Sequence, residues 1–439
     1  MSSKTRSKSG DFKPTPYWWE ATPLHEATAE PLPGQADVAI VGAGYTGLVA
    51  ALTLARAGRS VIVLDAQAPG EGASTRSGGV GGAGLQRSFG NLVGDVGLEA
   101  AKAIYDEAAA ARAHLETLIA EEGIECGYTV AGLFSGAVRQ RDYDSLGRAT
   151  DLLNKHFDLG VEMVPRAEQH REVGTDAYFG GRLTPYVATV NPAIFHAGLL
   201  HRAMDAGVTV IGHTRVTGII REGQGFTANT SRGSIRARDI VVATNGYTDA
   251  VDPWLRRRVI PLRSRMIVTE SLAPEVMDRL IPKRRVVGDT RRLHTYFRPS
   301  PDGTRILLGG RALTGEAAGD AAVVAADAER LRGELIAVFP ELDGVRLTHS
   351  WSGRVAMTFD LLPHKGVHDG VHFAAGFCGS GVSWGPWLGR KIALRLLGEG
   401  EERSNFDLHP MESRPLYWGN PWFMPVVFAW RRFRDRVGF

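Results

Sequence analysis

The sequence predicts an α/β fold joined to a mixed, largely antiparallel α+β part, and three observations carry this prediction. Residues 37–65 run as apolar strand, glycine turn, helix and apolar strand, which is the pattern of a parallel βαβ unit. Residues 259–311 alternate as short strands with turns such as Pro301-Asp302-Gly303, which favours antiparallel pairing. Residues 95–123 repeat alanine, leucine and isoleucine at helical spacing, so a long amphipathic helix should follow the βαβ unit.

The composition is that of a globular protein and excludes several classes. The chain has 439 residues, a length that suffices for about two domains. Of these residues 44% are hydrophobic and 23% charged, which excludes a disordered chain. Its formal charge of +3 is too balanced to indicate a nucleic-acid partner. Only two cysteines, Cys126 and Cys378, occur, which excludes a disulfide framework and a cysteine-rich zinc site. No apolar run reaches the roughly 18 residues that span a bilayer, and we expect a cytoplasmic protein.

The remaining elements follow in chain order. Residues 1–35 contain five prolines, so we expect an irregular arm that the Trp18–Trp19 pair anchors to the body. Asn191 caps a predicted helix that ends at Gly207, and residues 401–439 form a tail with an aromatic and basic finish. We expect further helices at 48–58, 141–158, 323–338 and 386–397, and strands at 208–211, 216–220, 226–230, 234–238, 239–244 and within 345–385.

The strongest motif is Gly42-x-Gly44-x-x-Gly47, which lies between a predicted strand and a predicted helix. Its glycines allow a tight turn, a close approach of the backbone to a pyrophosphate and close helix–strand packing. The helix N-terminus supplies N–H groups for phosphate. Asp65 ends the second strand, 18 residues after Gly47, where a carboxylate can bind both ribose hydroxyls and disfavours a 2′-phosphate. The unit predicts a Rossmann-like dinucleotide site, and NAD and FAD both fit it.

Several segments together resemble the FAD-dependent amine and amino-acid oxidase family, which includes D-amino-acid oxidase, glycine oxidase, sarcosine oxidase and γ-glutamylputrescine oxidase. The matching segments are residues 36–48, 61–65, 72–79, 215–220, 240–246, 351–364 and 376–389. The resemblance covers residues 17–400, and the tail is similar to that of the putrescine-type members. We therefore divide the chain into an N-terminal arm (1–35), a discontinuous FAD-binding domain (36–95, 190–255 and 345–400), a substrate domain (96–189 and 256–344) and a C-terminal tail (401–439).

The resemblance also implies which residues hold the cofactor. The residues expected around the ADP and pyrophosphate portion of FAD are Gly42, Gly44, Tyr45, Thr46, Gly47, Asp65, Ala66, Ser74, Thr75, Arg76, Gly78, Gly79, Val216, Ala243, Thr244 and Gly246. Those expected at the isoalloxazine end are Gly376, Gly379, Ser380, Gly381 and Val382. N–H groups there would stabilise the anionic reduced flavin.

The same resemblance bears on how FAD is attached. Members with covalent FAD carry either a histidine in the early glycine loop or a cysteine before a Thr-x-Asp motif. Residues 70–90 contain no histidine, and Gly353 or Arg354 stands near the cysteine position. We therefore predict non-covalent FAD and interpret Cys378 as a small packing residue.

The substrate end carries weaker signals. Members that act on amino acids hold the carboxylate with an arginine and a tyrosine, and Arg354 stands one residue from the position of that arginine; a structural ion pair is the alternative. Arg265 replaces the glutamine usual in a strand under the flavin, which would favour an acidic substrate. Tyr296 lies on a strand that would line the substrate domain or face solvent. Trp384 would form a pocket wall or pack its own helix. These four are the candidate catalytic residues.

These observations predict an FAD-dependent oxidoreductase that oxidises the C–N bond of a primary or secondary amine or an amino acid by hydride transfer to flavin N5. Water would hydrolyse the imine, and O2 as acceptor would give hydrogen peroxide. The alternatives are an amine dehydrogenase that serves a quinone or carrier, a flavin monooxygenase, and a flavoprotein scaffold without turnover. The histidines show no metal-ligand spacing. We expect a monomer or homodimer whose tail packs on the body or a subunit rather than on a membrane surface.

Overall fold

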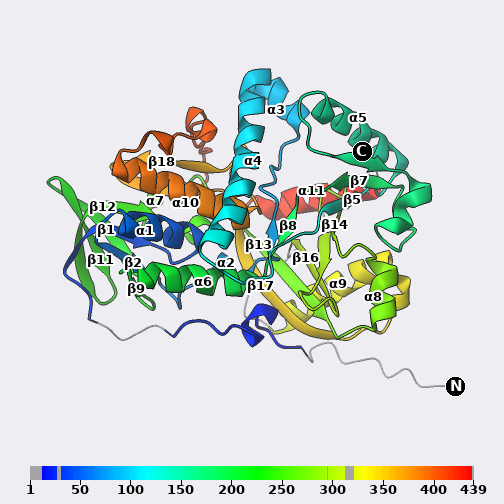
Figure 1. Ribbon diagram of the computed structural model, residues 1–439, viewed down its shortest axis with the longest axis horizontal. Helices are drawn as coiled ribbons and strands as arrows, with labels where there is room; N and C mark the ends of the chain where they lie inside the picture. Colours follow the sequence, from blue (N-terminus) through cyan, green and yellow to red (C-terminus); the bar gives the residue numbers. More distant parts are fainter. Residues whose placement is uncertain (1–11, 27–30, 294, 312–320, 438–439) are drawn as a thin grey trace.

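The computed structural model describes residues 12–26, 31–293, 295–311 and 321–437. Two eight-stranded sheets form its halves, and Figure 1 shows the first on the left and the second on the right. A small third sheet joins β3 (Val80–Gly81), β8 (Ala188–Thr189) and β4 (Thr129–Val130). The predicted combination of an α/β part with a largely antiparallel part is confirmed.

The first sheet contains the predicted βαβ unit. Its strands are β10 (Val216–Glu222), β11 (Gly225–Thr230), β12 (Gly233–Val242), β1 (Gln35–Val41), β2 (Val61–Leu64) and β9 (Thr209–Ile211) in that order, with β19 (Val371–Ala375) beside β12 and β18 (His364–His368) beside β19. β1 is parallel to β2 and to β12, and β2 is parallel to β9. Because the carboxyl ends of these strands share one edge, a ligand site at that edge is expected.

The second sheet is antiparallel apart from one pair. Its order is β17 (Leu347–Met357), β13 (Ile260–Thr269), β16 (Ile306–Arg311), β15 (Thr295–Pro299), β14 (Val286–Asp289), β5 (Leu133–Gly136), β7 (Gly181–Thr184) and β6 (Glu162–Val164). Only β14 and β5 run parallel among the neighbours described. β17 pairs with β13 along the whole strand, so part of the segment 345–400 belongs to this sheet, whereas β18 and β19 return to the first. The division into domains stays a prediction.

The described residues contain eleven α-helices. They are α1 (Tyr45–Arg56), α2 (Ala73–Arg76), α3 (Phe89–Val96), α4 (Leu98–Glu121), α5 (Gln140–Asn154), α6 (Pro192–Asp205), α7 (Pro253–Arg256), α8 (Pro274–Leu280), α9 (Ala321–Val338), α10 (Gly381–Leu397) and α11 (Met424–Val437), and α2 and α7 are single turns. The helix predicted at 95–123 begins only after Gly97, whose φ of +82° separates α3 from α4. None of the described helices is long and apolar enough to cross a membrane.

Close packing brings α10 to the βαβ unit. A Cβ atom on Gly389 would lie 2.4 Å from the carbonyl oxygen of Thr46, and one on Gly385 would lie 3.2 Å from the Thr46 hydroxyl. The two helices can approach this closely only because both positions are glycine. The N-terminus of α10, at Gly381, is thereby fixed near the N-terminus of α1.

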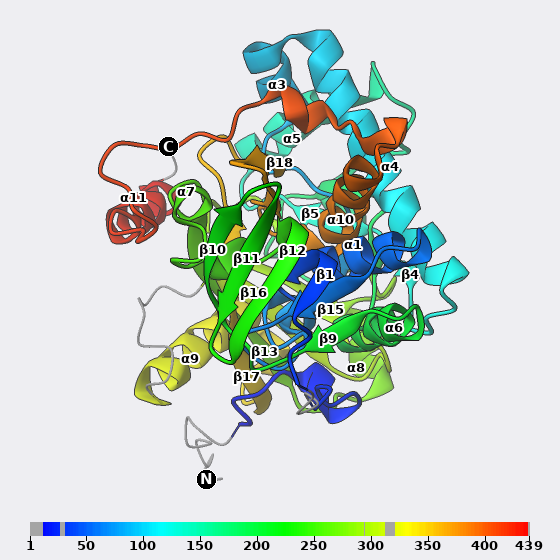
Figure 2. The same ribbon diagram turned by 90° about the vertical axis from the view of Figure 1, so that its left-hand side faces the viewer.

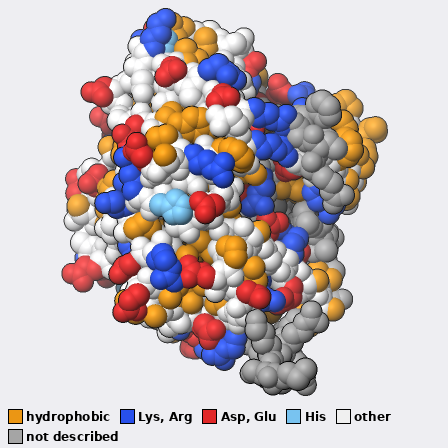
Figure 3. Space-filling view, turned by 90° about the vertical axis from the view of Figure 1, so that its right-hand side faces the viewer, with side chains coloured by type: hydrophobic (Ala, Val, Ile, Leu, Met, Phe, Trp, Pro, Cys, Tyr) orange, Lys and Arg blue, Asp and Glu red, His pale blue; other side chains and the backbone are white. Residues whose placement is uncertain are grey.

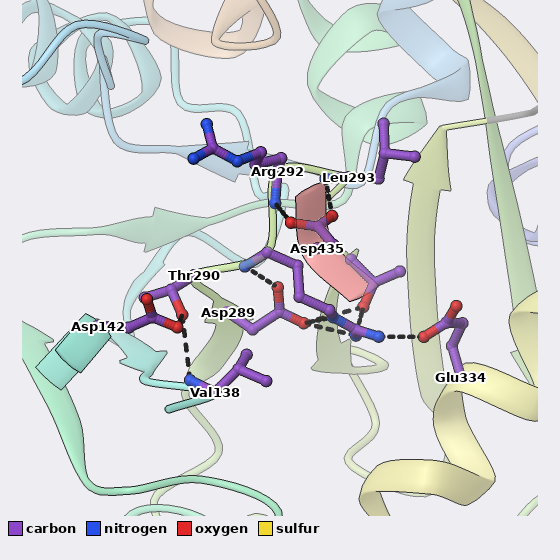
Figure 4. A network of polar contacts seen from close by, with 10 residues as sticks. Val138, Asp142, Asp289, Thr290, Arg292, Leu293, Glu334 and Asp435 are labelled. Atoms are coloured by element: carbon purple, nitrogen blue, oxygen red, sulfur yellow. Dashed lines mark hydrogen bonds and ion pairs between the residues drawn. The ribbon is translucent and has the colours of Figure 1, made fainter. Parts of the chain in front are cut away.

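The arm and the tail both pack on the body. Trp18 is fully buried within a short 3-10 helix, Tyr17–Glu20, which confirms the predicted anchor. In the tail, α11 buries Met424 and Phe428, and the Asp435 carboxylate accepts hydrogen bonds from two backbone N–H groups of the loop after β14, as Figure 4 shows. Figure 2 shows α11 at the edge of the molecule. On the face in Figure 3, basic and acidic side chains are mixed, in keeping with the small net charge.

Candidate active site

A cavity of about 480 Å³ connects the two sheets. Its lining begins at the carboxyl ends of β1 and β2, with Gly42 and Asp65, and extends to Met266 of β13, Tyr296 of β15 and Arg354 of β17. One cavity therefore joins the predicted dinucleotide site to the face of the second sheet.

The turn between β1 and α1 leaves no room for side chains. Gly42 has a φ of +109°, and a Cβ atom on Gly47 would lie 2.0 Å from the Gly42 carbonyl oxygen. A Cβ atom on Gly44 would lie 2.9 Å from the Ser74 hydroxyl. Since the cavity lining includes Gly42, Gly44 and Tyr45 at the start of α1, the backbone and a helix N-terminus are open to a phosphate group.

The Asp65 carboxylate is oriented by two backbone donors. The N–H of Ala43 lies 2.9 Å from one carboxylate oxygen, and the N–H of Gln67 lies 3.0 Å from the other. Burial raises the pKa of the Asp65 carboxyl above its ordinary value, and these two hydrogen bonds oppose that rise. Each oxygen keeps a further lone pair, so the carboxylate can accept hydrogen bonds from a ribose while the turn holds it in place.

Two indoles fix the loop that follows α2. Trp18 and Trp351 donate their Nε1–H groups to the carbonyls of Ser77 and Arg76, each over 2.9 Å. The two tryptophans are fully or almost fully buried. The loop is thus fixed from the arm on one side and from β17 on the other, and only the tryptophan of the arm was singled out from the sequence.

Arg298 holds the same loop from β15. Its Nη1 donates to the carbonyls of Gly78, Gly79 and Val190 at 2.9–3.1 Å. The side chain is only 4% exposed, and burial lowers the pKa of its guanidinium to about 10. A buried cation that satisfies three carbonyls is a strong positional constraint, and its role could not be found from a sequence motif.

His196 supports the glycine turn from α6. Its Nε2 lies 2.7 Å from the carbonyl oxygen of Ala43. Burial lowers the pKa of this imidazole to about 4, so the ring is neutral near pH 7 and Nε2–H is the donor. The bond restrains the residue between Gly42 and Gly44.

Most of the predicted site residues surround the cavity. Its lining includes Gly42, Gly44, Tyr45, Thr46, Asp65, Ala66, Ser74, Arg76, Gly78, Val216, Ala243, Thr244, Gly379, Gly381, Val382, Tyr296 and Arg354. Gly47, Thr75, Gly79, Gly246, Gly376 and Ser380 lie outside that lining. Several of these allow close packing instead: a Cβ atom on Gly376, for example, would lie 2.2 Å from Thr358 Cγ2. Their individual roles toward the cofactor stay predictions.

Two candidate catalytic side chains line the cavity. The Arg354 guanidinium lies 5.5 Å from the ring centre of Tyr247, and the side chain is exposed. The Tyr296 hydroxyl lies 3.2 Å from Met266 Sδ, and burial raises the pKa of Tyr296 to about 12. Tyr296 therefore stays protonated near pH 7 and can donate a hydrogen bond.

The other two candidates lie away from the cavity. Arg265 alternates with Met266 along β13 and so points to the opposite face, where its Nε lies 3.4 Å from an Asp327 carboxylate oxygen of α9. Trp384 is fully buried in α10, with its ring 5.2 Å from that of Phe406 in an edge-to-face arrangement. The structure thus gives Arg265 an internal ion pair and Trp384 a place in the core.

Comparison with known proteins identifies the class. Residues 37–395 match the model of the DAO family, described as FAD dependent oxidoreductase. The chain belongs to this family of flavoenzymes, and its cofactor is FAD. The glycine turn, the oriented Asp65 carboxylate and the helix N-terminus fit that cofactor.

Individual relatives agree with the family. The chain is 30% identical over 416 residues to gamma-glutamylputrescine oxidoreductase of Escherichia coli. The alignment covers 92% of this chain and 93% of that protein. It is 29% identical over 378 residues to the probable oxidoreductase OrdL of Haemophilus influenzae, with 85% of each covered. Among solved structures, glycine oxidase from Geobacillus kaustophilus superposes with a TM-score of 0.71 at 23% identity and covers 87% of this chain and 99% of that one. The predicted resemblance is confirmed.

Proposed function

We propose that this flavoenzyme oxidises the C–N bond of a primary or secondary amine or an amino acid, with O2 as the electron acceptor. The observation that carries the proposal is the single cavity that joins the cofactor cradle to Met266, Tyr296 and Arg354. The names of the relatives, which include a gamma-glutamylputrescine oxidoreductase and a glycine oxidase, support the same substrate class. When bound, FAD supplies the group that accepts a hydride from the substrate carbon next to nitrogen.

The cradle residues would hold the cofactor along the cavity. The β1–α1 turn and the N-terminus of α1 would bind the pyrophosphate, and Asp65 would accept hydrogen bonds from the ribose. Gly379, Gly381 and Val382 line the cavity at the start of α10. Their N–H groups would favour negative charge on the pyrimidine edge.

The lining is suited to a neutral amine. Its carboxylates are Asp65 and Asp249, whereas Arg76, Arg215 and Arg354 supply three positive charges. A nearby cation and a low-dielectric wall both disfavour a protonated amine. Since an amine must be neutral to give up hydride, this environment would favour the reactive form. Arg354 would bind a carboxylate on the substrate.

We further propose that FAD is held without a covalent bond. Cys378 is buried, and its Sγ lies 3.6 Å from the Thr358 hydroxyl, which is a packing environment. Acid precipitation of the holoprotein should leave a colourless pellet and a yellow supernatant. A yellow pellet would contradict the proposal.

The test of the reaction is anaerobic titration of the purified holoprotein with polyamines, N-methyl amino acids and D-amino acids. One class should bleach the flavin absorption band, and admission of air should restore the band with formation of hydrogen peroxide. Bleaching that air does not reverse would keep the amine chemistry but contradict O2 as acceptor. A band that no amine bleaches would contradict the proposed function.

A further inference from the structure

The tail exposes an unusual amount of apolar surface. Among the described residues, twelve large hydrophobic side chains are exposed, and six of them lie within residues 416–433. Each of the six is more than half exposed: Leu416, Trp418, Trp422, Val426, Trp430 and Phe433. Exposed apolar side chains that are scattered singly need no explanation, whereas a group of them within one short segment marks an interaction surface.

The exposed side chains of α11 form an apolar stripe that points away from the body. The helix buries Met424 and Phe428 against the body, whereas Val426, Trp430 and Phe433 are 53–71% exposed. The exposed side chains follow one another after four and then three residues, which places them on one face of the helix, opposite the buried pair. Figure 2 shows this helix at the edge of the molecule.

The segment before α11 extends the apolar stripe and is held by polar contacts. Trp422 stands four residues before Val426, and its Nε1–H donates to the carbonyl of Leu416 over 3.1 Å. The guanidinium of Arg257, just after α7, lies 3.8 Å from the ring centre of Trp418. These contacts fix both indoles while more than half of each side chain stays in solvent.

The same segment is strongly basic. Residues 414–437 contain five arginines and a single acidic residue, Asp435, which gives a formal charge of +4. The Asp435 carboxylate accepts two backbone hydrogen bonds from the body. Arg432 is exposed, and the Arg434 guanidinium lies 6.0 Å from the ring centre of Trp430. The helical spacing places Arg432 and Arg434 on the two sides of the apolar stripe.

The charge of the segment decides between two kinds of partner. Aromatic and aliphatic side chains bordered by arginines are typical of helices that lie in a membrane–water interface. Anionic lipid headgroups would complement the basic charge. A second copy of the chain, paired symmetrically through this face, would bring two segments of +4 together, and their repulsion would oppose the contact.

We propose that residues 414–437 dock on an anionic lipid surface, with the apolar stripe among the headgroups and the arginines on the lipid phosphates. The sequence favoured packing of the tail on the body over a membrane contact. One face of α11 does pack on the body, and the proposal assigns the membrane contact to the opposite face. None of the six exposed side chains lines the first cavity, so the inference is independent of the proposed reaction.

The test is flotation of the FAD-loaded full chain with lipid vesicles. The protein should float with vesicles of equal parts phosphatidylcholine and phosphatidylglycerol, and it should stay behind with phosphatidylcholine alone. High salt should release it, because salt screens exposed charges. Trp430→Ser combined with Phe433→Ser should weaken binding by about 10- to 100-fold, since the apolar area that enters the interface is lost. Arg432→Gln should weaken it about 5-fold.

Two matched variants outside the tail control for general changes of the surface. Ile220→Ser removes a side chain of β10 that is 50% exposed, and Arg236→Gln removes an exposed charge of β12. Both should bind the anionic vesicles as the unaltered protein does. All variants should keep their flavin content and melting temperature, because the substituted side chains are exposed and lie outside the first cavity.

The other outcomes overturn the inference. These are no flotation, equal flotation with both kinds of vesicle, and full binding by the Trp430→Ser, Phe433→Ser protein or by Arg432→Gln. Sedimentation velocity covers the remaining partner: a concentration-dependent dimer that the double variant abolishes, without vesicle binding, would assign the apolar stripe to a second copy of the chain. Arg432→Gln keeps the test decisive if the double variant fails to fold.

Discussion

The two ends of the first cavity are built in different ways. The cofactor end comes mostly from two short segments, 42–46 and 72–78, and from Asp65, and buried donors hold carbonyls of these segments. The substrate end collects single side chains from β13, β15 and β17, among them the exposed Arg354. The binding of one fixed cofactor requires a particular backbone geometry, and the residue types that permit this geometry form a recognisable sequence motif. The binding of a substrate that varies between relatives requires only a few side chains on a sheet, and these form no motif. Changes at the two ends should therefore have different effects.

The largest effect is expected for Arg298→Met, which removes the donor to three buried carbonyls of the cofactor end. The variant should lose about 3–5 kcal/mol of unfolding free energy, because three buried carbonyls lose their donor at about 1–3 kcal/mol each, together with bound flavin. Chemical denaturation and flavin absorbance measure both. Arg346→Met, at an arginine whose side chain is 69% exposed, should cost at most about 1 kcal/mol. Equal losses of unfolding free energy and bound flavin in the two variants would contradict the proposed role of Arg298.

Next in size is Gly44→Val at the glycine turn, where even a Cβ atom would lie 2.9 Å from the Ser74 hydroxyl. Overpacking of about 1–3 kcal/mol should weaken FAD binding by about 10- to 100-fold. Equilibrium dialysis of the flavin measures the change. Gly34→Val is the matched control, because nothing lies within 4 Å of a Cβ atom there. A Gly44→Val protein that retains its full flavin would refute the assigned cradle.

A smaller effect is expected at the substrate end. Arg354→Ala should raise KM for a carboxylate-bearing amine by about 10-fold, the lower range for a charged hydrogen bond, because the side chain is exposed. Flavin content should not change. Steady-state kinetics with an amine that lacks a carboxylate gives the control, since its KM should stay constant. A KM that is unchanged for both amines would show that Arg354 does not bind the substrate carboxylate.

The smallest effect concerns pH and the cofactor end. The pKa of His196 is lowered to about 4 from 6.5, so its contribution to stability is complete above pH 6.5 and is lost as the pH falls toward 4. Between pH 6.5 and 5.5 this loss is about 1 kcal/mol. His196→Gln keeps a donor for Ala43 without titrating, and it should flatten the pH dependence of both unfolding and flavin release.

His114 provides the comparison for this prediction. Burial also lowers its pKa to about 4, but it lies on α4, where its ring packs against that of Trp387. His114→Gln should flatten the pH dependence of unfolding and leave that of flavin release unchanged. If the two variants release flavin with the same pH dependence, His196 has no special role in the cradle.

Most of the residues predicted for the cofactor end line the cavity, because the constraints on such a turn are local. Gly42, Gly44, Gly47 and Asp65 fall within one βαβ unit, and each serves backbone geometry that only certain residue types permit. The role of Arg298 escaped prediction, since a hydrogen bond from a side chain to distant carbonyls leaves no pattern in the sequence.

The substrate end and the tail needed the three-dimensional structure. Whether Arg265 or Met266 faces the cavity depends on which face of β13 is turned inward, and a shift of one residue reverses the answer. No helix was predicted within the tail, yet α11 begins at Met424 with Pro425 in its first turn, where proline is tolerated.

The most direct test of the central claim is anaerobic stopped-flow reduction of the flavin by a substrate amine, compared with the same amine deuterated at the carbon next to nitrogen. The account predicts that the flavin band bleaches and that deuteration slows the bleaching several-fold, because the C–H bond breaks as hydride leaves for the cofactor. Bleaching at the same rate with both amines, or no bleaching at all, would contradict it.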